Sequence, residues 1–186
     1  MRIVAILIDV LFLSEPAFAQ SRGSVTLAEL QGAAIEMKFE REQMVKREGN
    51  EYPVRIEVDL KVVLGPGDRI KWVLGNTIHT PNGVQKPEPA TFSSRLEKPE
   101  QTNSFGTGHG VWVFSEGVLT TLRTLPTGAF KREISFTRGP KGLECTAKEG
   151  VAREDGTGGV IMTAPDGRPV TIVSERLASS SCRIRK

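Results

Sequence analysis

The residues from 54 to 62 alternate strictly between apolar and charged side chains, and this period of two limits what the chain can fold into. The apolar positions are Val54, Ile56, Val58, Leu60 and Val62, and the charged ones are Arg55, Glu57, Asp59 and Lys61. Successive side chains of a strand point to opposite faces, so this pattern predicts a strand with one buried face and one wet face. Such strands are typical of antiparallel sheets, because parallel sheets are usually covered on both faces.

The same alternation recurs along much of the chain. Ile35, Met37 and Phe39 alternate with charged residues, and a Gly-Pro-Gly-Asp turn at 65–68 leads into Ile70, Trp72 and Leu74. Further short apolar runs separated by glycine-rich turns follow from residue 110 onward. Short strands at near-regular spacing predict an all-β fold, a single antiparallel β-barrel or sandwich of about eight to ten strands. We favour a barrel, because closure leaves no strand edge unpaired.

Two parts of the chain depart from this period-two alternation. Thr26 and Glu29 have the spacing of a capping box and Gly32 is a helix stop, so a short N-terminal helical turn is predicted. The stretch from about 75 to 110 is rich in proline and glycine, and only Phe92 to Leu96 resembles a strand. A long irregular segment inside a compact domain is typically a functional loop or disordered.

The first 19 residues have the pattern of a cleavable secretory signal peptide. Arg2 precedes an apolar run from Ile3 to Leu13, and Ala17-Phe18-Ala19 supplies small residues at the cleavage positions. Asp9 interrupts the apolar run. We therefore expect a signal peptide over 1–19 and a periplasmic or secreted product beginning at Gln20, a position where a lipid anchor would require cysteine.

The length and the charge of the chain limit the number of domains and the classes of binding partner. Residues 20–186 are enough for one domain and too few for two of ordinary size, so a single β-rich domain is expected. The formal net charge of the whole chain is +3, and positive and negative residues alternate along it. Without a basic stripe, binding to nucleic acid or to an anionic membrane is not expected as the main role. No run after the signal peptide is apolar enough to span a bilayer.

Cys145 and Cys182 both belong to the part expected to be exported. An oxidising compartment lets such a pair persist as a disulfide, whereas a metal or redox pair would need C-x-x-C spacing or flanking histidines. The bridge would close about 37 residues and stabilise the fold by about 4 kcal/mol on the loop-entropy model. We predict that it ties the C-terminal segment to a central strand.

No catalytic motif or cofactor fingerprint occurs, so no cofactor is predicted. His79 and His109 are the only histidines, and with Glu97 or Glu100 they could form a three-ligand metal site if the segment between them folds as a flap. The alternative is that both are ordinary polar loop residues. The glycine-rich stretch around His109 leads into a predicted strand, which disfavours a phosphate cradle because a cradle opens a helix.

Trp72, Trp112 and Phe114 are the candidate ligand-binding residues, because aromatic side chains often line the mouth of a barrel. At period-two spacing the same residues also suit an ordinary core. Both interpretations stay open.

Val111 to Thr120, Leu122 to Thr124, Cys145 and the ending Ser179 to Arg183 resemble a group of small exported bacterial proteins that carry no assigned activity. This resemblance implies export and a cysteine pair. The chain is also similar to lipocalin and calycin barrels in having a helical turn followed by glycine at the first strand. Their Gly-x-Trp is Gly32-Ala33-Ala34 in this sequence, so ligand binding is not carried over.

Three hypotheses follow. The first is an exported β-barrel that binds a small apolar ligand or a partner in the cell envelope. The second is a metal-assisted hydrolase that uses the segment between His79 and His109, and the third is a purely structural envelope protein.

Overall fold

The fold is almost entirely β-structure. The computed structural model describes residues 24–96, 104–105, 108–125, 128–153, 160–163 and 167–185. The expected signal peptide, residues 1–19, lies outside these ranges. Of the helices in the described ranges, none has the length and apolar character needed to cross a membrane.

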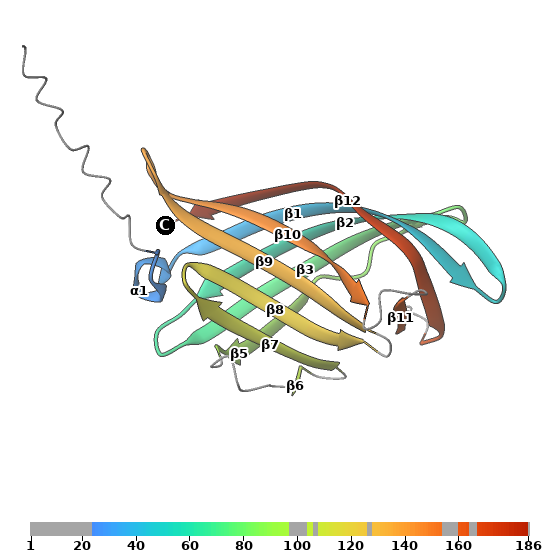
Figure 1. The fold of residues 1–186 in the computed structure, drawn as a ribbon, viewed down its shortest axis with the longest axis horizontal. Helices are drawn as coiled ribbons and strands as arrows, with labels where there is room; N and C mark the ends of the chain where they lie inside the picture. Colours follow the sequence, from blue (N-terminus) through green and yellow to red (C-terminus); the bar gives the residue numbers. More distant parts are fainter. Residues whose placement is uncertain are drawn as a thin grey trace, which may run out of the picture.

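The described residues form one short helix and twelve strands in two sheets (Figure 1). The helix is α1 (Leu27–Leu30), and the strands are β1 (Ala34–Arg47), β2 (Asn50–Leu64), β3 (Arg69–Thr80), β4 (Gly83–Gln85), β5 (Ala90–Arg95), β6 (Ser104–Phe105), β7 (Gly108–Ser115), β8 (Val118–Leu125), β9 (Gly128–Gly139), β10 (Gly142–Arg153), β11 (Val160–Thr163) and β12 (Pro169–Arg185). Sheet A has the order β11-β12-β1-β2-β3-β4, with β5 also paired to β3, and sheet B has the order β10-β9-β8-β7-β6.

Every strand pair is antiparallel, which confirms the all-β antiparallel prediction. The pairings among the described residues leave two separate sheets and do not close a barrel. There are more strands than the expected eight to ten, partly because the stretch from 75 to 110 is more regular than its composition suggests. β3 continues to Thr80, and β4, β5 and β6 follow within that stretch.

The core lies between the two sheets. The inward row of β2 includes Val58, Leu60 and Val62, all at most 2 % exposed, as the alternation predicts. Leu119 and Ile134 of sheet B pack into the same cluster and are fully buried. Each such side chain contributes about 1.5 to 3 kcal/mol by leaving water, so this shared cluster holds the sheets together.

The predicted helical turn is present as α1, at one end of the sheets (Figure 1). Leu30 is fully buried in the core cluster. The backbone N–H of Thr26 donates to the Glu29 carboxylate at 2.8 Å, and Arg138 of β9 donates to the same carboxylate at 2.9 Å. The bond from Thr26 is the largest cause of a lowered pKa at Glu29, and Arg138 adds to it. One carboxylate thus caps the helix and joins it to sheet B.

Replacing Gly117 by alanine is expected to destabilise the contact between this N-terminal segment and sheet B. Gly117 has a φ of 77°, and a Cβ there would lie 3.3 Å from the backbone nitrogen of Val25. The left-handed backbone alone costs about 1 to 2 kcal/mol for a non-glycine residue. Gly49→Ala is the matched control, because Gly49 has a φ of 86° with nothing within 4 Å of its Cβ position. Urea unfolding should show a larger loss for Gly117→Ala, and equal losses would contradict the contact.

Candidate functional site

The three aromatic candidates belong to the interior. Trp72 of β3 and Trp112 of β7 are 7 % and 2 % exposed, and their ring centroids lie 5.3 Å apart. Phe114 is half-buried and faces Phe136 across 6.3 Å. The two tryptophans therefore join sheet A to sheet B on the side of β3 and β7, where they pack against each other.

The two histidines lie on different sheets. His79 is on β3 of sheet A, where its Nε2 is 3.0 Å from Glu57 Oε1 on the neighbouring strand β2. His109 is on β7, and its backbone pairs with Ser104. Glu97 and Glu100 lie outside the described residues. In the described part of the chain, no three His, Cys, Asp or Glu side chains gather as a metal site would require.

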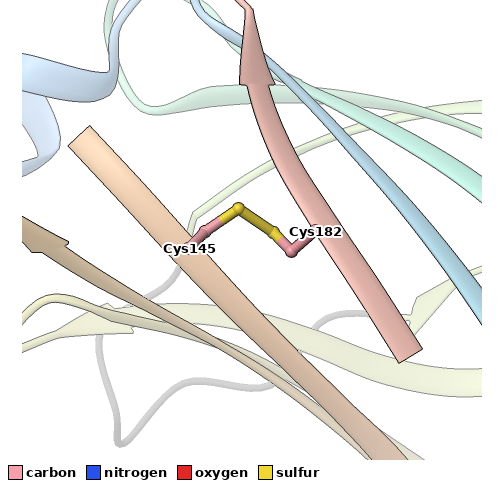
Figure 2. Close-up of a disulfide and its surroundings, with 2 residues drawn as sticks. All are labelled: Cys145 and Cys182. Atoms are coloured by element: carbon pink, nitrogen blue, oxygen red, sulfur yellow. A yellow bond between two sulfur atoms is a disulfide. The ribbon is translucent and has the colours of Figure 1, made fainter. Parts of the chain in front are cut away.

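Cys145 and Cys182 form the predicted disulfide, with their sulfur atoms 2.00 Å apart. Figure 2 shows the bridge crossing from β10 of sheet B to β12 of sheet A. Farther along the same two strands, the backbone N–H of Val151 donates to Glu175 Oε1 at 3.0 Å. Side chains therefore join the two sheets along this seam, where the described strands share no backbone ladder.

An ionic cluster occupies the interior beside that seam. Arg41 and Gln43 come from β1, Arg132 from β9, Glu149 from β10 and Glu175 from β12. Arg132 Nε donates to Glu149 at 2.7 Å, and Arg41 Nε lies 3.1 Å from the other oxygen of Glu149. The Glu149 side chain is 0 % exposed. The two arginines and the two glutamates thus balance in charge. This matters because burying an isolated charge in the interior would cost several kcal/mol of folding free energy.

Aromatic rings complete the surroundings of the cluster. The Arg132 guanidinium lies 5.2 Å from the ring centroid of Phe39 and 5.2 Å from that of Phe130. Burial lowers the pKa of Arg132, while the negative charge of Glu149 opposes this shift. Contact with a ring face offsets part of the lost hydration of a guanidinium.

The sequence did contain a signal for this cluster, which the search for motifs missed. Continuing the inward row of β1 from Ile35 to Phe39 by two-residue steps reaches Arg41 and Gln43. In the same way, Glu149 continues the inward row that passes through Ala147 of β10. A charged residue at a buried position of an alternating strand points to an interior ion pair.

A groove of about 750 Å³ runs over the outer face of sheet A and is the candidate binding site. Its floor is formed by the outward residues of β1, β2, β3 and β12, and the segment 86–89 between β4 and β5 lines it as well. This face consists of the charged positions of the alternating strands. The residues beside the groove therefore arise from the same pattern that builds the core.

Cations outnumber acids in the groove. The cations are Lys38, Lys61, Lys86, Arg183 and Arg185, and the acids are Glu36 and Asp59. Lys38 pairs with Asp59 at 3.0 Å, and Arg185 pairs with Glu36 at 2.6 Å. Within the described residues, Lys61, Lys86 and Arg183 have no acidic partner at ion-pair distance. The groove therefore retains three uncompensated positive charges.

The register of sheet A explains how two of these cations come together. Glu36 on β1 lies opposite Arg183 on β12 and opposite Lys61 on β2. The pKa of Glu36 is lowered, first by the hydrogen bond from Arg185 and also by the positive charges of Arg185, Lys61 and Arg183. A single carboxylate thus stands in a row of cations, and this part of the surface has a positive potential.

The side of the groove nearest β3 is apolar. Val73 and Gly75 of β3 line it together with Pro87 and Pro89. A Cβ on Gly75 would lie 3.8 Å from Pro89 Cγ, so the proline ring packs directly against the Gly75 backbone. The groove therefore combines an apolar wall with a cationic one.

Comparison of the chain with protein families, curated proteins and solved structures finds no match.

Proposed function

We propose that this chain is an exported binding protein that holds an anionic component of the cell envelope in the groove of sheet A. The observation that carries the proposal is the set of three cations, Lys61, Lys86 and Arg183, that line one groove without acidic partners among the described residues. Clustered positive charge in a concave site attracts anions, both by direct pairing and by raising their local concentration.

Export is part of this proposal and is supported by two features. Residues 1–19 have the pattern of a signal peptide, and the disulfide between Cys145 and Cys182 is of a kind that persists in oxidising compartments. An envelope component is therefore the class of partner such a chain would meet first.

The anionic partner is favoured over a small apolar ligand held between the sheets. The candidate residues for that ligand, Trp72 and Trp112, contact each other within the core cluster. The groove, in contrast, is open to solvent and brings together charged residues from β1, β2, β12 and the segment 86–89.

Charge reversal at Lys61 and Arg183 tests the proposal. Inorganic polyphosphate is a suitable probe, because it is a polyanion without sugar or lipid. The double variant Lys61→Glu/Arg183→Glu is expected to bind polyphosphate at least about tenfold more weakly, since each lost charged contact contributes on the order of 1 kcal/mol. Isothermal titration calorimetry at two salt concentrations measures the affinity, which should fall with added salt.

The matched control is Lys141→Glu/Arg95→Glu, which changes the net charge equally at two exposed positions outside the groove. This control should bind nearly as well as the unmodified protein. An equal loss in both double variants would mean that net charge alone drives binding, and absence of binding by the unmodified protein would also reject the proposal.

A further inference from the structure

Building on the proposed function, we propose that the groove of sheet A selects an acidic glycan rather than polyanions in general. Three kinds of chemistry meet in the groove: unpaired cations, free hydroxyl groups and a flat apolar wall. An acidic sugar polymer presents the complement of each, with carboxylate or phosphate groups, hydroxyls and apolar ring faces.

The hydroxyl groups come from Thr77 and Ser181. Thr77 is on β3 and lies opposite Glu57, while Ser181 is on β12 and lies opposite Lys38. Both side chains line the groove, and neither hydroxyl has a hydrogen-bond partner among the residues that the structure describes. Each can therefore donate one hydrogen bond to a ligand and accept others, which suits a partner rich in hydroxyls.

The apolar wall is shaped for a flat group. Pro87 and Pro89 offer ring carbons and lack a backbone N–H, and Pro89 packs so close to Gly75 that a Cβ there would already touch the proline ring. A sugar ring presents a face of C–H groups that packs against such a surface. A bulky side chain at Gly75 would displace the Pro89 ring and disrupt this wall.

Other polyanions fit these features less well. Single-stranded nucleic acids are held by aromatic side chains on which bases stack, and the groove lining contains no aromatic residue among the described positions. An acyl chain would need a buried apolar cavity, whereas this groove is open to solvent and is lined by five cations and two acids.

The experiment compares polygalacturonate, a carboxylated glycan, with poly-L-glutamate, a carboxylated peptide, by calorimetry under the same salt conditions. We expect polygalacturonate to bind at least tenfold more tightly per site. Gly75→Leu should weaken polygalacturonate binding at least tenfold and leave polyphosphate binding within twofold. Thr77→Val/Ser181→Ala should weaken polygalacturonate binding about fivefold, and circular dichroism verifies that each variant is folded.

The control for the hydroxyl variant is Thr146→Val/Ser174→Ala, which removes two hydroxyls at exposed strand positions outside the groove and should change nothing. Equal affinity for the two carboxylated polymers, with no effect of Gly75→Leu, would overturn the glycan inference. The proposed anion site would survive that result if polyphosphate binding still depended on Lys61 and Arg183. Loss of all binding would reject both.

A second arm distinguishes the source of the glycan. The protein is sedimented with vesicles that contain lipopolysaccharide and with vesicles that contain phosphatidylglycerol, which is anionic but carries no sugar polymer. Binding to lipopolysaccharide vesicles supports a glycolipid headgroup as the ligand, and binding to polygalacturonate alone supports a free polymer. Equal binding to both kinds of vesicle would overturn the inference.

Discussion

Replacing Glu149 by glutamine is expected to lower the free energy of unfolding by about 3 to 5 kcal/mol. The Glu149 carboxylate is fully buried and contacts both Arg132 and Arg41. A glutamine of nearly the same shape removes its charge, so Arg132 would lose the carboxylate that it binds and Arg41 would keep only Glu175. The remaining buried cations would be poorly compensated, which is the costly outcome for an interior ion pair.

Urea unfolding followed by tryptophan fluorescence measures this effect. Glu144→Gln is the matched control, because Glu144 is an exposed residue of the same strand and its loss should cost under about 0.5 kcal/mol. The double variant Arg132→Met/Glu149→Leu should recover much of the stability, since it removes both charges and leaves apolar side chains of similar volume. If Glu149→Gln were as stable as the control, the cluster would not contribute to the fold as described.

Removing the disulfide is the second large effect expected. The double variant Cys145→Ala/Cys182→Ala opens a loop with a sequence separation of 37 residues. On the loop-entropy model, the unfolded chain gains freedom worth about 4 kcal/mol. The effect should be strong because no backbone ladder joins β10 to β12 among the described residues.

Thermal and urea unfolding with and without a reducing agent measure the contribution of the disulfide. Reduction should destabilise the unmodified protein to about the level of the double variant and should leave the double variant unchanged. A protein whose stability is insensitive to the reductant would contradict the role of the bridge.

The sequence was informative wherever a rule of local geometry applied. The alternation from Val54 to Val62 correctly predicted which residues face the core, and the capping box at Thr26 and Glu29 correctly predicted α1. The cysteine pair was also predicted correctly, from compartment and spacing. The first two predictions depend on residues that are close in sequence. The third depends on there being only two cysteines, which leaves one possible pair.

The sites were harder to predict because they depend on long-range register. Arg41 meets Glu175 across β1 and β12, where the register shifts between Glu40 and Arg41 and again between Met44 and Val45. The extra residue of each bulge is on β12, so the alternation along β1 shows which residues face inward but not which residues of β12 they meet. The groove likewise requires Lys61 and Arg183 to lie on either side of Glu36, although they are far apart in the sequence.

The strand order of sheet A also determines when, during folding, the sheet can be completed. β1 has β12 on one side and β2 on the other, so the earliest strand cannot be fully paired until β12 has emerged during synthesis. High contact order of this kind slows folding, since a long loop must close before its contacts are gained. Cys182 lies within β12, so the covalent bond can form only in these late stages. Throughout elongation, sheet A therefore remains incomplete.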